Sequence, residues 1–208
     1  MVKGVIFDMD GVLVDSEPFY HAQRLEYLRR MDYTPGDTIH RVGSNEPEIW
    51  AALVPESEQL RKELLMGYHG FRQLHPTPYA ALLNPGALEL LAELRRRGIK
   101  TGIASSSVWE SVDRMLETTG ASFYIDHAVS GEDCAAYKPD PEVYLKALEA
   151  LELKAEETIA VEDSPASIAA ARNAGIRVYA LRQHYGQPID QSAAEAVIEN
   201  LKDILKCL

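Results

Sequence analysis

The sequence predicts an α/β fold, with a Rossmann-like parallel sheet core flanked by helices and an inserted all-helical cap domain. Short runs that are apolar on both faces alternate with helical patterns, and such runs are typical of buried parallel strands. A long helical stretch interrupts this alternation after the first run. The 208 residues, 46% hydrophobic and 25% charged, suffice for one domain that carries a smaller insert.

Apolar runs mark the expected strands of the sheet. We expect strands at 2–7, 99–104, 125–129, 158–161 and 176–181, and a last strand near 196–198. Between two of these runs, Leu88, Leu91 and Leu94 recur at helical spacing, and the pattern ends in three arginines and Gly98, which favour a helix C-terminus. Strands that alternate with helices form right-handed βαβ units, so we expect a parallel sheet with helices on both faces.

The helical insertion follows the first strand. Its first helix is indicated by Tyr20, Leu25 and Leu28, and no good strand pattern occurs before the proline-rich segment 75–78. The predicted domains are an α/β core of residues 1–15 and 81–208 and a helical cap of residues 16–80.

Charge and cysteine content exclude several classes of protein. The net charge is −11 and the pI is near 5.0, which disfavours binding to nucleic acid and to anionic membranes. The two cysteines form no CxxC pair, so thiolate zinc sites and a disulfide framework are not expected. Aspartates interrupt the apolar start, which therefore resembles neither a signal peptide nor a membrane span. We expect a soluble cytoplasmic monomer.

Chemically reactive residues stand where the predicted strands end. In an open parallel sheet, ligands bind at the carboxyl ends of the strands. The segments at or after these ends are Asp8-Met9-Asp10-Gly11, Ser105-Ser106-Ser107, Lys138-Pro139 and Glu162-Asp163-Ser164. Each has a plain structural alternative, since such residues also form turns, helix caps and solvated surfaces. Their occurrence at successive strand ends favours a shared site.

The residue types at these ends predict phosphate chemistry around a metal. Four acids in one pocket cannot all ionise without a cation, and an oxygen-rich cluster suits Mg²⁺. Asp8 can be both ligand and nucleophile, and Asp10 can act as general acid and then general base. Gly11 permits close approach of the backbone to a phosphate. Ser105 with the following amides can bind an anion, and Lys138 supplies a cation.

Four stretches, FDMDGVLVDSEP, IASSS, YKPDPEVY and VEDSPASIAAARNAG, resemble the four motifs of the haloacid dehalogenase superfamily. Their order and spacing are similar to the branch of sugar-phosphate phosphatases and β-phosphoglucomutases that carries a helical cap. The resemblance covers essentially the whole chain. It implies that Asp8 is the phosphorylated nucleophile, that Asp10 is the acid and base, and that Ser105 and Lys138 bind the phosphoryl group. The Mg²⁺ ligands it implies are Asp8, the Asp10 carbonyl, Glu162 and Asp163.

The cap departs from the mutase pattern. The mutases carry a cap arginine for a second phosphate, and Asn45 stands at the position that we align with it, although Arg41 is near. Tyr137 replaces a small residue and is expected to narrow the pocket. The candidate substrate-binding residues are Gly11, Ser106, Arg41, Asn45 and His21.

These observations predict a Mg²⁺-dependent phosphomonoester hydrolase. It is expected to act on a small phosphorylated metabolite, a sugar or polyol phosphate, through an aspartyl-phosphate intermediate. The first alternative is a β-phosphoglucomutase-like mutase, which shares every core residue. The second is a non-enzymatic phosphorylation switch or binding module on the same core.

Overall fold

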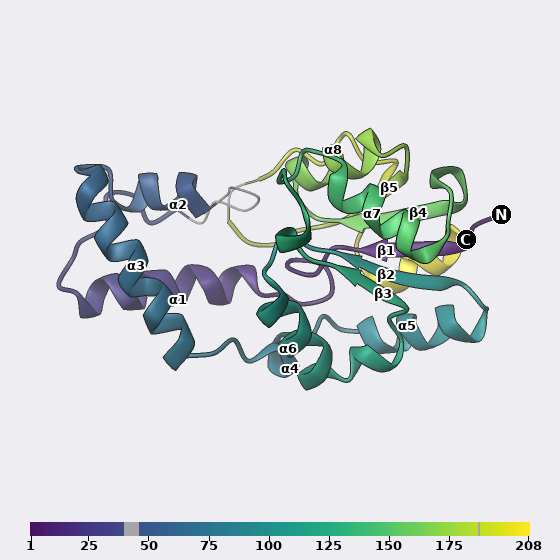
Figure 1. Cartoon of the computed structure of the whole chain (residues 1–208), viewed down its shortest axis with the longest axis horizontal. Helices are drawn as coiled ribbons and strands as arrows, with labels where there is room; N and C mark the ends of the chain where they lie inside the picture. The colour runs from purple at the N-terminus through teal and green to yellow at the C-terminus, as the bar shows by residue number, and fades with distance from the viewer. Residues whose placement is uncertain (40–45, 187) are drawn as a thin grey trace. The chain divides into compact units, whose positions relative to one another are not determined.

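Residues 1–39, 46–186 and 188–208 are described by the computed structural model, and in these ranges the strands form one parallel sheet (Figure 1). The strand order is β3-β2-β1-β4-β5-β6, with β1 between β2 and β4. The strands are β1 (Gly4–Phe7), β2 (Lys100–Ala104), β3 (His127–Val129), β4 (Thr158–Glu162), β5 (Arg177–Leu181) and β6 (Ala196–Ile198). The predicted parallel sheet is confirmed, and most strands begin one or two residues later than the apolar runs.

Helices lie in the connections between successive strands from β1 to β5, whereas the described residues between β5 and β6 form none. The α-helices are α1 (Glu17–Arg30), α2 (Glu46–Leu53), α3 (Glu58–Leu74), α4 (Tyr79–Leu82), α5 (Ala87–Arg96), α6 (Trp109–Thr119), α7 (Glu142–Leu151) and α8 (Pro165–Asn173). Short 3₁₀ helices lie at Ala121–Phe123, Gly131–Asp133, Ala155–Glu157 and Leu201–Lys206. No helix in the described part of the chain is long and apolar enough to cross a membrane.

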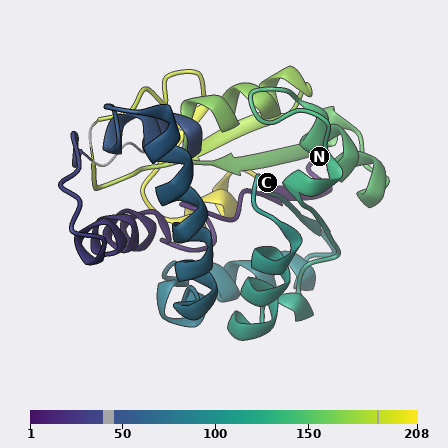
Figure 2. The same cartoon turned by 60° about the vertical axis from the view of Figure 1, so that its left-hand side comes forward.

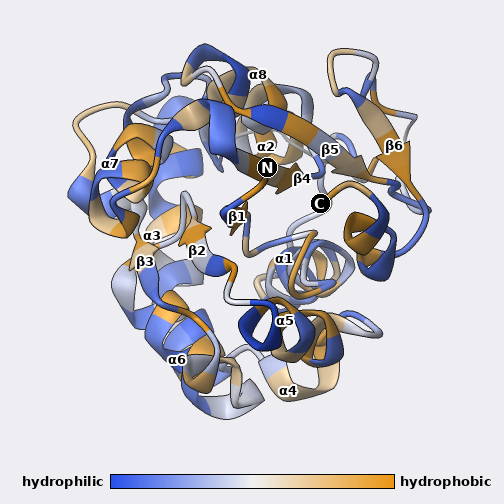
Figure 3. Ribbon diagram, turned by 90° about the vertical axis from the view of Figure 1, so that its right-hand side faces the viewer, coloured by the Kyte–Doolittle hydropathy of each residue, from blue (hydrophilic) through white to orange (hydrophobic). Residues whose placement is uncertain are grey.

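The sheet separates two apolar clusters because successive side chains of a strand point to opposite faces. Val5 and Phe7 of β1 belong to a cluster that contains the buried leucines of α5 and the buried residues of α6. Ile6 belongs to the other cluster, with residues of α7 and α8. Figure 3 shows both hydrophobic and hydrophilic residues on α6 and α7, as expected for helices that cover a sheet. Both faces are therefore buried, which explains the continuous apolar runs.

The described chain divides into two compact units. The sheet unit comprises residues 1–15, 79–183 and 189–208, and the helical unit comprises residues 16–78 and 184–188. The predicted boundary on the return to the core was 80/81. In the structure Tyr79 already belongs to the apolar cluster of the sheet unit and is 1% exposed. The sequence predicts the second segment of the helical unit as core, whereas its described residues, 184–186 and 188, group with the helices.

The helical unit has its own aromatic core. Tyr27 of α1, Trp50 of α2 and Tyr68 of α3 are buried, and their ring centroids lie 5.3–6.4 Å apart. These helices are coloured purple to blue in Figure 2. Gly67 of α3 has no side chain, and an added Cβ would lie 2.2 Å from the Tyr27 hydroxyl. A glycine here lets α1 and α3 pack closely.

Candidate active site

Strand register brings two acids together at the carboxyl edge of the sheet. Phe7 of β1 pairs with Val161 of β4, so the next residues, Asp8 and Glu162, are neighbours. The Asp8 amide donates to the Val161 carbonyl at 3.0 Å and continues the ladder by one residue. Asp163 follows directly. Carboxylate oxygens of Asp8, Glu162 and Asp163 all lie within 4.8 Å of one another, and all three residues are buried.

Lys138 lies inside this cluster of acids. Its Nζ is 3.2 Å from Asp8 Oδ2 and 2.8 Å from Glu162 Oε1, and its side chain is 4% exposed. The alternative of a solvated surface lysine is therefore wrong. Burial by itself would lower the pKa of Lys138, but the charges of Asp8 and Glu162 outweigh it and raise that pKa. The raised pKa favours the charged ammonium form of Lys138, which lies between Asp8 and Glu162.

Burial raises the pKa of Asp8 above the value of 3.8 that is usual for an aspartate. Loss of water, and then the nearby charge of Glu162, raise the pKa of Asp8 to about 7, although Lys138 opposes this shift. One ammonium group does not balance three buried carboxylates. The donor set is made of carboxylate oxygens with an excess of negative charge, which fits a hard divalent cation such as Mg²⁺. These residues therefore fit the metal that the sequence predicted.

The loop after β1 needs a glycine at position 11, because the Asp163 side chain lies too close for a larger residue. The φ of Gly11 is +78°, and an added Cβ would lie 2.2 Å from Asp163 Oδ2. We expect Gly11 beside the substrate, and the structure adds that the chain passes the Asp163 carboxylate at this position. The Gly11 carbonyl accepts from Gln183 Nε2 at 2.9 Å, and Gln191 Nε2 donates to the Asp163 carbonyl at 2.6 Å. No sequence signal marked either glutamine.

The loop after β2 carries the predicted serines. Ser105 is 1% exposed, and its hydroxyl oxygen accepts from the Ser107 amide at 3.0 Å. Ser106 is exposed. The hydroxyl of Ser107, which the sequence argument did not single out, donates to Asp10 Oδ2 at 2.7 Å. The loops after β1 and β2 thus meet through the Asp10 carboxylate.

Tyr144 of α7 is a member of the buried cluster that sequence reasoning missed. Its hydroxyl donates to Glu162 Oε1, the oxygen that also contacts Lys138, and Lys138 Nζ lies 5.3 Å from the centroid of its ring. Burial, followed by the charges of Glu162 and Asp8, raises the pKa of Tyr144 well above its usual value. The apolar spacing of α7 indicated only packing for this residue.

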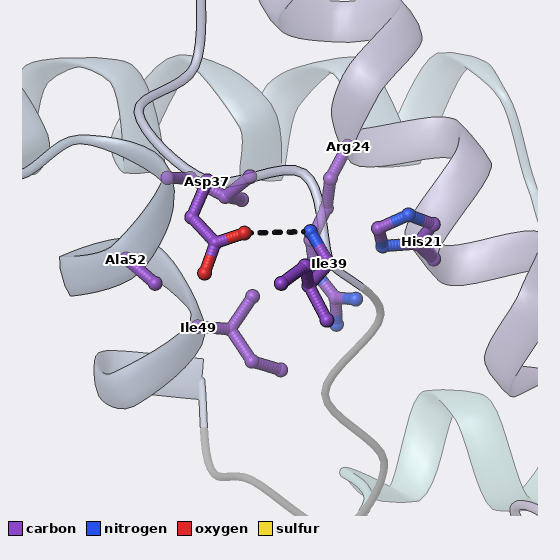
Figure 4. Close-up of a pocket in the computed structure, with 7 residues that line it drawn as sticks. His21, Arg24, Asp37, Ile39, Ile49 and Ala52 are labelled. Carbon is purple, nitrogen blue, oxygen red and sulfur yellow. Dashed lines mark hydrogen bonds between the residues drawn. The ribbon is translucent and has the colours of Figure 1, made fainter. Parts of the chain in front are cut away.

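The remaining predicted residues belong to the helical unit, to the exposed surface of the sheet unit, or to the ranges that the structure does not describe. His21 of α1 lines a pocket of the helical unit, together with Arg24 and Asp37 (Figure 4). Arg24 Nε is buried there without a hydrogen-bond partner, and Asp37 Oδ1 accepts from the Ile39 amide at 2.8 Å. Arg41 and Asn45 lie outside the described residues. Tyr137 is 73% exposed and takes no part in the buried cluster.

The parallel sheet with an acidic cluster at its carboxyl edge is the architecture of the family that the motifs resembled. A family model described as "Haloacid dehalogenase-like hydrolase" matches residues 5–181. The chain belongs to this family, and the predicted resemblance is confirmed.

Two curated relatives specify the class further. The chain is 30% identical to "Phosphorylated carbohydrates phosphatase" of Thermotoga maritima, over 99% of each chain. It is 32% identical to "Validoxylamine A 7'-phosphate phosphatase" of Streptomyces hygroscopicus subsp. limoneus, over 85% of this chain and 84% of the relative. The chain is accordingly an enzyme, placed among the phosphatases of the superfamily.

A solved structure supports the fold. The β-phosphoglucomutase of Clostridium difficile matches with a TM-score of 0.73 and 20% identity, covering 99% of this chain and 96% of that chain.

Proposed function

We propose that this protein is a Mg²⁺-dependent phosphomonoester hydrolase that releases phosphate from a small phosphorylated carbohydrate. The observation that carries the proposal is the buried cluster of Asp8, Lys138, Glu162 and Asp163 at the end of β1 and β4. It combines a candidate nucleophile with a fixed cation and a set of oxygen ligands. The names of the two phosphatase relatives support a phosphorylated carbohydrate as the substrate class.

Asp8 is the proposed nucleophile. Its carboxylate attacks the phosphorus atom, the bond from phosphorus to the ester oxygen breaks, and an aspartyl phosphate forms. Lys138 Nζ, 3.2 Å from Asp8 Oδ2, lies where it can stabilise the phosphoryl oxygens as their charge develops. The Met9 amide donates to Asp8 Oδ1 at 2.7 Å and orients the carboxylate.

Asp10 is the proposed acid and base. It gives its proton to the departing alkoxide of the sugar and becomes a carboxylate. That carboxylate then takes a proton from water, whose oxygen attacks the aspartyl phosphate at phosphorus. Phosphate leaves, Asp8 is restored, and Asp10 is protonated for the next turnover.

Asp8, Glu162, Asp163 and the Asp10 carbonyl are the proposed Mg²⁺ ligands. A Mg²⁺ held by these residues would supply positive charge that favours ionised Asp8 and stabilises negative charge on the phosphoryl group. Glu162 is held by Lys138 and Tyr144, so its carboxylate enters the site with its orientation fixed. Lys138, Tyr144 and the Asp163 amide thereby arrange the negative charge that the ion requires.

Phosphate release tests the function directly. Glucose 6-phosphate, β-glucose 1-phosphate and glycerol 3-phosphate are supplied with Mg²⁺ or with EDTA, and inorganic phosphate is measured. We expect release with Mg²⁺ from at least one of them, none with EDTA, and none from Asp8→Asn. Asp113→Asn, the same change at an exposed position on α6, is the control that keeps activity. Equal release with and without Mg²⁺, or full activity of Asp8→Asn, contradicts the proposal.

The same reactions distinguish a hydrolase from a mutase. A mutase returns the phosphoryl group to sugar, so β-glucose 1-phosphate with a bisphosphate primer gives glucose 6-phosphate. We expect free phosphate to exceed glucose 6-phosphate. The opposite ratio would assign the mutase reaction to this chain and direct attention to Arg41.

A further inference from the structure

The hydroxyl of Ser107 is not used to cap the helix that follows it. Helix α6 begins at Trp109, and the residue at its N-cap is Val108, whose side chain makes no cap hydrogen bond. The Trp109 amide donates to Glu132 Oε2 at 2.7 Å. A serine just before a helix commonly accepts hydrogen bonds from its first amides. Here the carboxylate of Glu132, in the 3₁₀ helix Gly131–Asp133, accepts from the Trp109 amide instead.

The backbone of Ser107 is fixed on both sides. Its amide donates to Ser105 Oγ at 3.0 Å. Its carbonyl accepts from Ser130 Oγ at 2.7 Å and from the Gly131 amide at 3.1 Å. Gly131 permits this contact, since an added Cβ would lie 2.5 Å from the Ser106 carbonyl oxygen. Hydrogen bonds therefore hold the backbone of Ser107 between the loops after β2 and β3, and this backbone sets the position of its side chain.

We propose that Ser107 is a positioning residue that orients Asp10 for proton transfer to the leaving group. Its Oγ donates to Asp10 Oδ2 at 2.7 Å. A carboxyl group is planar, so holding Oδ2 fixes the direction of Oδ1. A proton donor works only when it is aligned with the oxygen that receives the proton. The inference rests on the proposed function, which makes Asp10 the acid and base.

The test compares two leaving groups in Ser107→Ala. p-Nitrophenolate departs readily without a proton, whereas the alkoxide of glucose 6-phosphate requires one. The test uses kcat/KM because it reports the steps up to departure of the leaving group and excludes the later base step, which both substrates share. We expect kcat/KM to fall about tenfold for glucose 6-phosphate and about twofold or less for p-nitrophenyl phosphate, losses smaller than the full effect of an acid catalyst. Ser107→Thr, which keeps the hydroxyl, should restore most of the lost rate.

Two further variants separate positioning from a general structural effect. Glu132→Gln weakens the cap of the same helix and should change kcat/KM by the same factor for both substrates. Asp10→Asn should itself impair glucose 6-phosphate more than p-nitrophenyl phosphate, and adding Ser107→Ala to it should cause no further selective loss.

The outcomes distinguish the inference from the proposed function. An equal loss on both substrates in Ser107→Ala, or a further selective loss in the Asp10→Asn background, overturns the positioning role and leaves the hydrolase proposal standing. If the unaltered protein hydrolyses neither p-nitrophenyl phosphate nor any of the three carbohydrate phosphates, the proposed function fails and the positioning role fails with it. If Asp10→Asn shows no preference between the two leaving groups, the acid role of Asp10 fails, and the positioning role of Ser107 fails with it.

Discussion

A carboxylic acid whose pKa is about 7 makes the metal-free protein sensitive to pH. Asp8 has its ordinary pKa of 3.8 in the unfolded chain and a raised one in the folded state. Between these values the folded protein binds more protons, so its free energy of unfolding falls as pH rises from about 4 to about 7. Asp8→Asn removes the titrating carboxyl group and with it this contribution to the pH dependence of stability. In EDTA its melting temperature should decline less between pH 5 and pH 8 than that of the unaltered protein. Parallel declines would contradict the assignment.

Tyr144 is expected to stabilise the fold through a single hydroxyl group. Tyr144→Phe keeps the buried ring and removes the donor to Glu162. A hydrogen bond to a charged group contributes about 1.5–3 kcal/mol, so the free energy of unfolding should fall by that order. Urea denaturation measures it. Tyr137→Phe removes the same group from an exposed residue and should change stability by less than about 0.5 kcal/mol. Equal effects of the two changes would show that the contact contributes little.

At the scale of elements, the turn after β1 depends on one glycine. Gly11→Ala introduces strain at φ +78° and a Cβ that clashes with Asp163. Gly120, at the C-cap of α6, has φ +77° and open space around the added Cβ, so Gly120→Ala isolates the strain. Each should cost about 1–2 kcal/mol from the backbone alone. Only Gly11→Ala should also lose most of its turnover. A matching loss in Gly120→Ala would attribute the effect to stability.

The sequence predicted the site residues that directly follow a strand, because the pairing of the strands determines where those residues lie. Asp8 and Glu162 follow from two apolar runs, because parallel pairing leaves little choice of register. Contacts that depend on loop conformation could not be predicted in this way. Ser107 and Asp10 are far apart in sequence, and nothing in either segment encodes their meeting. Tyr144 had the helical spacing of a packing residue, and its hydroxyl bond appears only in three dimensions.

At the scale of the whole molecule, the proposed metal site at the acidic cluster predicts that metal binding stabilises the fold. A ligand that binds only the folded state adds about 2.7 kcal/mol at a hundredfold excess over Kd. Mg²⁺ should therefore raise the melting temperature, and Asp163→Asn should largely abolish the rise. Ca²⁺ should also raise it but support little turnover, because its looser coordination displaces the attacking carboxylate. No rise in either metal would contradict the site, and full turnover with Ca²⁺ would contradict the geometric argument.

Central placement of β1 has a consequence for biosynthesis. Asp8 is attached to a strand whose neighbours, β2 and β4, lie far along the chain, at Lys100–Ala104 and Thr158–Glu162. Contacts between such distant segments form slowly, because closing the long intervening loop costs entropy before the contacts can stabilise the chain. On a translating ribosome, Asp8, the proposed nucleophile, emerges long before Lys138 and Glu162. We therefore expect Asp8 to be inactive in nascent chains until β4 has paired with β1.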